Sequence, residues 1–298
     1  MNLNEIFPQE YKGHQVRKHL KTLIITSSDY KQHAKFYKSQ NYDKIEINPV
    51  YYTPKNLDFL SNFHNLKSLK ILTSNIDDIE GIYYLNSLVE LLIDNKQKCS
   101  INFSRFPLLK NALLTWGSPG CESIFECLNL EKLRIDNFSE AEIWPISNCD
   151  KLIELEFNKP LIVNLNGVGE LKQLNRLDIY GARRLGSLDQ LKKLPSLETL
   201  TLTKCKALAD SLSSLGECKA LRELQIDDIG TIENVKFADN LEKLEYFRFV
   251  NTKIIDGDLE NLFRKYRYGN LKTVQFKNAR HYSHKLKDFG IDIRSPFS

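Results

Sequence analysis

Two short segments of this 298-residue chain carry residue types that occur in phosphoryl-transfer sites. Asp288-Phe289-Gly290 matches a tripeptide whose aspartate holds magnesium in kinases, and Gly167-Val168-Gly169 has two glycines at the spacing of a phosphate-binding turn. The first has no accompanying glycine-rich loop, strand lysine or His-Arg-Asp segment. The second lacks the setting of a strand that turns into a helix. Neither segment therefore indicates phosphoryl transfer.

Two histidines near the C-terminus have a spacing at which they could hold one metal ion. His281 and His284 are separated by two residues, but the sequence places no third ligand and no general base beside them. The chain also shows no Ser/His/Asp or Cys/His arrangement of the kind that nucleophilic enzymes use. We therefore predict that the protein is not an enzyme and that it holds neither a metal nor another cofactor.

One pattern of leucines recurs along most of the chain. Segments that read L-x-x-L-x-L or a weaker version of it start 21 to 27 residues apart. Because alternate residues of a strand face opposite sides, each segment predicts a short strand with its leucines on one side. The twelve segments open at Leu20, Tyr42, Leu66, Leu88, Leu109, Leu130, Leu152, Leu174, Leu197, Leu221, Leu244 and Leu271.

These repeats indicate the architecture. A strand with one apolar face needs a second layer, and stacking of similar units supplies it. The pattern resembles the leucine-rich repeats, in particular the short class of about 22 residues found in bacterial cytosolic proteins. The resemblance implies an α/β solenoid: a leucine-rich-repeat arc with a concave parallel β-sheet and a convex side of short irregular, 3-10 or helical segments. We predict a single domain over residues 1–298, with an N-terminal cap (1–19), about twelve repeats (20–278) and a C-terminal cap (279–298).

The turns after the strands depart from the regular pattern. Leucine-rich repeats commonly have Asn or Cys at repeat position 9, but here only Cys205 fits, and no repeat has Asn there. We therefore predict turns whose hydrogen bonds differ from repeat to repeat. Four repeats have Asn at position 8 instead, where its side chain is expected to bond the turn: Asn95, Asn137, Asn251 and Asn278.

Three return segments and both ends carry further signals. Helical spacing of apolar residues predicts helices over residues 28–38 and 259–266 and a weaker one over 207–215. Ser28 offers a capping residue for the first of these helices. Leu3, Ile6, Phe7 and Val16 are expected to cover the open end of the first repeat, because a solenoid end exposes its core.

The cysteines fit the same framework. Cys127, Cys149 and Cys218 lie three residues before an opening leucine, where other repeats have Phe or Leu, so we expect buried thiols. The N-terminus has no basic segment followed by an apolar one, and no run approaches eighteen apolar residues. We therefore expect a cytoplasmic protein with no membrane association.

Function in this architecture is expected on the concave face. Strand positions 3, 5 and 7 point away from the core and line up across the repeats. Neighbouring repeats present an apolar group there, followed by a field of mixed charge, which is typical of a surface that recognises a protein. The alternative is that the leucines pack on one another and that the charges are a solvated sheet face. The predicted partner-binding residues are Leu72, Leu92, Leu113, Trp116, Arg134, Asp136, Glu156, Arg176, Asp178 and Tyr180.

The C-terminal end offers a second candidate surface. Residues 264–298 contain nine Lys or Arg and two Asp, a net charge of +7, whereas the whole chain has a net charge of +4. Tyrosines interleave with these charges, as in some nucleic-acid-binding segments. A basic end more often serves solubility, so nucleic acid is an unlikely partner.

The predicted function is non-enzymatic binding of a partner protein. A repeat domain with no effector module acts by occupying its partner, which favours an inhibitor or an immunity-type protein, as some bacterial leucine-rich-repeat proteins are. The alternative is an adaptor that brings two proteins together. No small-molecule substrate is expected.

Overall fold

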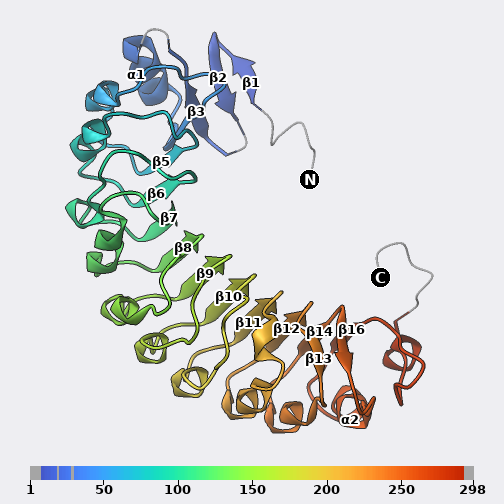
Figure 1. Ribbon diagram of the computed structural model, residues 1–298. Coiled ribbons are helices and arrows are strands. Elements are labelled where there is room, and N and C mark those ends of the chain that lie inside the picture. Colours follow the sequence, from blue (N-terminus) through green and yellow to red (C-terminus); the bar gives the residue numbers. More distant parts are fainter. Residues whose placement is uncertain (1–7, 19, 28–29, 292–298) are drawn as a thin grey trace. The chain divides into compact units, whose positions relative to one another are not determined.

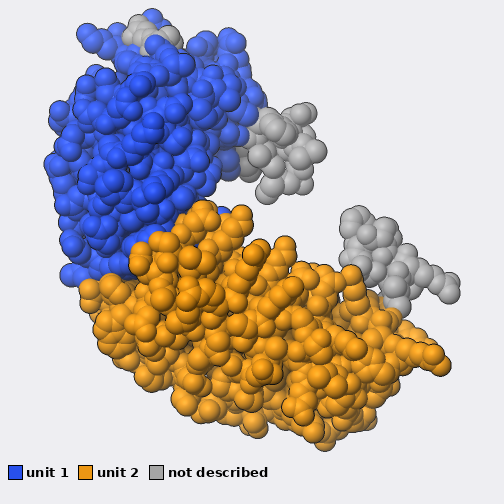
Figure 2. Space-filling model, in the orientation of Figure 1, with its two compact units in different colours: residues 1–135 blue, residues 136–298 orange. Residues whose placement is uncertain are grey.

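The computed structural model describes residues 8–18, 20–27 and 30–291. Contacts within the chain divide it into two compact units, residues 1–135 and 136–298 (Figure 2). Each unit is a stack of the predicted repeats. The prediction of a single domain stays a prediction.

Unit 1 begins with a hairpin that the repeat pattern did not predict. β1 (Gln9–Tyr11) pairs antiparallel with β2 (His14–Arg17), which pairs antiparallel with β3 (Thr22–Ile25). Strands β3 to β7 pair in parallel and in sequence order, and β8 follows β7 (Figure 1). The repeat strands after β3 are β4 (Lys44–Ile47), β5 (Ser68–Ile71), β6 (Glu90–Ile93), β7 (Asn111–Thr115) and β8 (Lys132–Asp136). The last residue of β8, Asp136, is the first residue of unit 2.

Unit 2 contains six repeat strands, which also follow sequence order and pair in parallel. They are β9 (Glu154–Asn158), β10 (Arg176–Tyr180), β11 (Thr199–Thr203), β12 (Glu223–Asp227), β14 (Tyr246–Phe249) and β16 (Thr273–Phe276). A separate two-stranded parallel sheet, β13 (Gly230–Ile232) with β15 (Thr252–Ile254), lies in the return segments. This small sheet was not predicted.

The return segments are short and mostly 3-10 helical, as predicted. Two are α-helices, α1 (Tyr30–Ser39) and α2 (Glu260–Tyr268), which confirms two of the helix predictions. The weaker third prediction is wrong, because residues 207–215 form parts of two 3-10 helices. The 3-10 helices are η2 (Asp58–Asn62), η3 (Glu80–Tyr84), η4 (Phe103–Arg105), η5 (Cys121–Glu126), η6 (Trp144–Asn148), η7 (Val168–Glu170), η8 (Leu191–Lys193), η9 (Lys206–Leu208), η10 (Leu212–Glu217), η11 (Lys236–Asn240) and η12 (Leu286–Phe289).

The core lies between the repeat strands and the return segments of each unit. The second leucine of the L-x-x-L-x-L segment is at most 2% exposed in Leu133, Leu155, Leu177 and Leu200. The cysteines at the predicted core positions are buried as well. Burial raises the pKa of Cys149 to about 11, so its thiol is protonated at neutral pH and packs as a small apolar group.

Only part of the predicted N-terminal cap can be compared with the structure. Val16 is fully buried, as expected. Leu3, Ile6, Phe7 and the capping residue Ser28 lie outside the described residues.

The turns of unit 2 correct the prediction of irregular hydrogen bonding. In five consecutive repeats, the N–H of position 8 donates to the carbonyl of position 7 in the next repeat, over 2.6 to 3.0 Å. Position 8 also has a positive φ in these five repeats, at Asn137, Lys159, Gly181, Lys204 and Asp228, and in the next repeat at Asn251. A backbone ladder thus replaces an asparagine ladder, and it is uniform.

The positive φ at position 8 also corrects the prediction that Asn at this position bonds the turn through its side chain. Asn tolerates a positive φ better than most residues, which explains Asn137 and Asn251 without any side-chain bond to the turn. The expected side-chain bonds are present elsewhere. Asn95 Nδ2 donates to the Leu72 carbonyl at 2.8 Å, and Asn278 Oδ1 accepts the N–H of Leu286 at 2.9 Å.

Candidate functional site

In each unit the described helices lie to one side of the repeat strands (Figure 1). Strand positions 3, 5 and 7 belong to the opposite side, which we call the strand face. All the predicted binding residues except Trp116 occupy these positions, and Trp116 follows β7. The two units are described separately because the predicted site has residues in both.

The apolar residues of unit 1 lie on neighbouring strands. Leu92 on β6 and Leu113 on β7 are direct partners in the parallel register, and both are half-buried. Leu72 directly follows β5 and is half-buried as well, as is Arg134 on β8. Side chains paired in this way contact one another, so part of their apolar surface is already covered. The strand face therefore presents an apolar group of moderate size.

Trp116, predicted to lie on the strand face, packs against a return segment instead. Its ring is half-buried and lies 5.8 Å from the ring of Phe125, measured between centroids. Phe125 belongs to η5 in the return segment and is buried. Trp116 thus packs against the return segment, so its truncation would also remove a packing contact.

Three predicted residues of unit 2 come from one strand. Arg176, Asp178 and Tyr180 are the outward residues of β10, and Asp178 is the direct register partner of Glu156 on β9. Arg176 Nε donates to Asp178 Oδ2 over 2.6 Å. The hydrogen bond with the Asp178 carboxylate raises the pKa of Arg176, so the guanidinium stays charged.

Burial of two aspartates on the strand face contradicts the expectation that these positions are exposed. Asp178 is 5% exposed and Asp136, at the end of β8, is 7% exposed. The long neighbouring side chains account for this, because a short carboxylate on a closely spaced sheet is covered by them. Arg176 is the clearest case, since its side chain crosses to Asp178 and remains 44% exposed. Among the described residues, Asp178 Oδ1 has no hydrogen-bond partner.

Sequence reasoning did not select a second arginine held in the same way. Arg248 Nε on β14 donates to Asp227 Oδ2 on β12 over 2.6 Å, and Asp227 is buried. Gln225 Nε2 also donates to Asp227 Oδ2, at 2.9 Å, and the Val250 N–H donates to Oδ1 at 2.7 Å. Gln275 accepts from the other end of the guanidinium at 2.8 Å. Gln225, Arg248 and Gln275 share strand position 5 on neighbouring strands. This shared position is the sequence signal from which their proximity could have been predicted.

The segments with possible catalytic chemistry have structural roles. The Asp288 carboxylate accepts the N–H of Lys285 at 2.7 Å, Phe289 is buried, and Gly290 has a φ of 73°, so the tripeptide forms a turn. Gly167 has a φ of 91°, and a Cβ there would lie 2.7 Å from the Trp144 carbonyl oxygen. Both glycines are required by the backbone.

The two C-terminal histidines do not converge on a metal site. His281 Nε2 lies 2.7 Å from the Ile254 carbonyl oxygen, whereas His284 stacks on Phe263 and lies 3.4 Å from Glu260. Among the residues that the structure describes, no three His, Cys, Asp or Glu side chains gather as metal ligands would. Neither described α-helix has the length and apolar character needed to span a membrane.

Comparison with known proteins identifies the fold. No model of a protein family matches the sequence, and no curated protein matches it. Among solved structures, an internalin (inlF) from Listeria monocytogenes str. 4b F2365 is 16% identical, with 89% of this chain and 84% of that chain covered and a TM-score of 0.52. The TLR13 chain of a TLR13–ssRNA13 complex is 18% identical, with 81% of this chain and 35% of that chain covered and a TM-score of 0.55.

At such identities the likeness concerns the fold alone. Both structures are built from leucine-rich repeats. The recurring L-x-x-L-x-L strands, their parallel pairing in sequence order and the buried leucines agree with this likeness. The chain therefore has the leucine-rich-repeat fold.

Proposed function

We propose that the protein is a non-enzymatic scaffold that recognises a partner protein through its strand face. The observation that carries this proposal is the pair of Arg176 and Asp178 beside Tyr180. The buried carboxylate holds an arginine that is itself 44% exposed, so less side-chain entropy is lost when a partner binds it. Arg and Tyr are also the residues that most often dominate the binding energy of protein interfaces.

Within unit 2, we propose a recognition surface composed of Asp136, Glu156, Arg176, Asp178 and Tyr180. Asp178 acts by holding Arg176, and Asp136 is buried as well. Arg248, held by Asp227, extends this surface along the strand face.

Within unit 1, we propose an apolar contact formed by Leu72, Leu92 and Leu113, with Arg134 and Trp116 beside it. The pairing of Leu92 with Leu113 supports it, because adjacent half-buried leucines give a continuous apolar area. A partner that covers this area would gain from its burial.

We propose that the protein acts in the cytoplasm as an inhibitor or immunity-type protein, which occupies the active surface of its partner. The burial of five of its six cysteines as thiols supports a reducing compartment. An adaptor that holds two proteins is the second candidate, and a groove between two return segments of unit 2 favours it. The basic end is a weaker candidate for binding, because the Lys285 ammonium donates to the carbonyl of Ala279 at 2.7 Å and so has a structural role.

Affinity capture from the native lysate, followed by quantitative mass spectrometry, would test the strand face. We expect Tyr180→Ala to weaken capture of the partner by roughly thirtyfold, because a central aromatic contributes at least about 2 kcal/mol. Arg176→Ala should weaken it too. Arg183→Ala is the matched control for arginine, as an exposed residue of the same repeat outside the strand, and Tyr268→Ala is the control for tyrosine.

Two outcomes would contradict the proposal. One is a partner captured equally by the wild type, Arg176→Ala and Tyr180→Ala. The other is loss of capture only when the exposed cations Arg280 and Lys287 are reversed in charge, which would move the site to the basic end. Abolition of the partner's activity would identify an inhibitor, whereas a ternary complex would identify an adaptor.

A further inference from the structure

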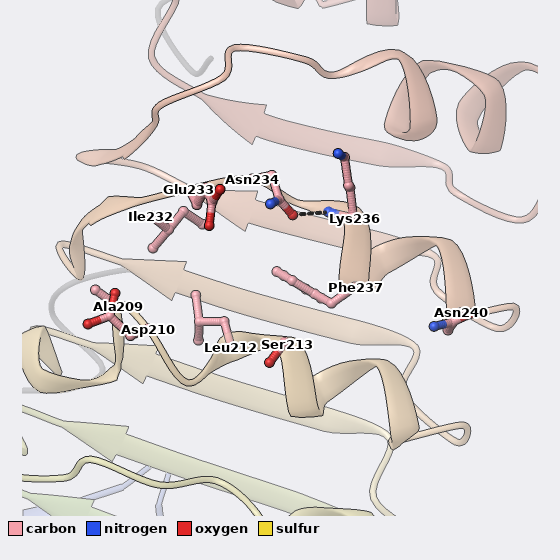
Figure 3. A pocket seen from close by; sticks show the side chains of 10 residues that line it. All are labelled: Ala209, Asp210, Leu212, Ser213, Ile232, Glu233, Asn234, Lys236, Phe237 and Asn240. Atoms are coloured by element: carbon pink, nitrogen blue, oxygen red, sulfur yellow. Dashed lines mark hydrogen bonds between the residues drawn. The ribbon is translucent and has the colours of Figure 1, made fainter.

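A groove opens between two return segments of unit 2, away from the strand face. Its volume is about 440 Å³, which lies within the usual range of ligand sites of about 300 to 1,000 Å³. One wall is the segment 209–213 and the other is formed by residues 232–240 (Figure 3).

The local hydrogen bonds explain why these two segments separate. Ser211 Oγ donates to the carbonyl of Gly186 in the preceding repeat at 2.6 Å, which ties the first wall to that repeat. The second wall begins at β13, whose strand partner is β15 in the following repeat. Asn234 Oδ1 then accepts the N–H of Lys236 at 3.0 Å and fixes the start of η11. The walls are thus held from opposite sides.

The floor of the groove is apolar. Leu212, Ile232 and Phe237 lie there and are 3%, 2% and 7% exposed. Figure 3 shows Leu212 and Phe237 reaching into the space between the walls. This floor suits a hydrocarbon chain rather than a hydrated ion.

Two carboxylates lie at one end of the groove. Asp210 and Glu233 come from opposite walls, and both are exposed. Among the described residues, neither forms an ion pair. Lys236 also lines the groove, but Figure 3 shows its ammonium directed away from Phe237 and beyond Asn234. The end with Asp210 and Glu233 therefore carries negative charge.

We propose that this groove binds a lysine or arginine side chain of a partner protein. The aliphatic stem of such a side chain would lie on Leu212, Ile232 and Phe237, with its cationic head between Asp210 and Glu233. Long basic side chains bury their stems in this way while the charge stays at the surface. A divalent cation fits less well, because it requires more oxygen ligands than two carboxylates supply.

This site is independent of the proposed surface on the strand face. The scaffold could therefore hold two protein segments at once, one on each side of unit 2. Linked sites of this kind raise the overall affinity without any new contact.

Chemical-shift changes of the ¹⁵N-labelled full-length chain would test the site. The probe is Nα-acetyl-lysine methylamide, and Nα-acetyl-norleucine methylamide is the matched probe that has the hydrocarbon stem but no ammonium. We expect the lysine probe to shift the amide signals of Asp210, Leu212, Glu233 and Phe237, with the norleucine probe about tenfold weaker. The lysine probe should also bind less tightly as the salt concentration rises.

Substitutions then locate the charge. The double variant Asp210→Asn with Glu233→Gln should lower the affinity for the lysine probe by about tenfold. The control, Asp239→Asn with Glu217→Gln, removes from the neighbouring 3-10 helices two exposed carboxylates whose side chains do not line the groove, and it should leave the affinity unchanged.

Several results would overturn the proposal. These are the absence of shifts at the groove, equal binding of the two probes, and unchanged binding by the Asp210 and Glu233 double variant. Displacement of the lysine probe by micromolar Mg²⁺ or Ca²⁺ would assign the carboxylates to a metal ion instead. A heptapeptide with one central lysine flanked by glycine and serine should bind at least as well as the lysine probe. Its failure to bind would exclude a protein segment.

Discussion

At the scale of single residues, the strand face combines buried carboxylates with partly exposed arginines. Asp178 holds Arg176, Asp227 holds Arg248, and in unit 1 Glu46 is bound by Arg17. A buried carboxylate is costly unless it is paired, so each acid depends on its partner. In return the acid fixes the position of the cation on the strand face.

Glu46 makes this dependence measurable through pH. Burial alone raises the pKa of Glu46, but hydrogen bonds from Arg17 and Asn48 and the charges of Arg17 and Lys70 outweigh it, so the net pKa is lowered. The unfolded chain therefore binds a proton at higher pH than the folded chain. The resulting stabilisation is present above the unfolded pKa, about 4.5, and is lost as the pH falls through the lowered value.

We accordingly expect the wild type to lose stability more steeply than Glu46→Gln does as the pH falls below about 4.5. Urea unfolding at a series of pH values measures this difference. Glu80→Gln, an exposed acid of the same unit, is the control and should follow the wild type. Parallel pH profiles for the wild type and Glu46→Gln would disprove the assignment.

At the scale of the elements, position 8 after each of the strands β8 to β12 is the constrained point of the repeat. Its positive φ aims the N–H at the next repeat and forms the backbone ladder. L-residues pay about 1 to 2 kcal/mol for this conformation, whereas glycine adopts it freely. Gly181 occupies the position in the repeat that contains Arg176 and Tyr180.

Gly181→Ala should therefore destabilise the protein by about 1 to 2 kcal/mol. Crowding is not the reason, because a Cβ at Gly181 would meet only the Lys159 side chain and backbone at 3.6 Å or more. Gly186→Ala is the matched control. It lies in the same repeat without a positive φ, its Cβ would meet nothing closer than 4.0 Å, and it should stabilise by about 0.4 to 1 kcal/mol. Equal effects of the two substitutions on thermal unfolding would refute the role of φ.

At the scale of the whole molecule, the two units are stacks of the same repeat with different turns. In unit 1 the residues at position 8, for example Thr73 and Asn95, do not have the positive φ that this position has in unit 2. In unit 2 the ladder runs to the following repeat. Repeat arrays are stabilised mainly between nearest neighbours, so a local defect should have its largest effect within its own unit.

Leu177→Ala tests this locality, since Leu177 is fully buried in the middle of β10. It should cost roughly 2 to 5 kcal/mol by leaving a cavity. Hydrogen exchange should show a larger loss of protection in β9, β10 and β11 than in β5 and β6. Leu161→Ala, at a side chain 45% exposed, should change stability by no more than about 0.5 kcal/mol. An equal loss of protection in both units would mean that the chain unfolds as one cooperative body.

Much of the fold could be read from the sequence because its signal is local and repeated. The spacing of the leucines determines which residues form strands and which side of each strand is buried, as Leu133 and Leu177 show. Helical spacing likewise predicted α1 and α2. A period of two residues in a strand, or of 3.6 in a helix, is visible in the sequence itself. Each stacked repeat uses the same pattern, so no further information is needed to predict its strand.

Only the tertiary structure decided how the outward residues contact one another. Arg176 and Asp178 are two residues apart, but the burial of Asp178 depends on the neighbouring strands, and the pairing of Arg248 with Asp227 joins residues of different repeats. The contact of Trp116 with Phe125 likewise depends on which side chains lie near it in the folded protein. The groove also arises between segments of different repeats, each tied to a different neighbour. Periodicity specifies which side of a strand a residue occupies, whereas burial and pairing are set by neighbours that the chain brings together only on folding.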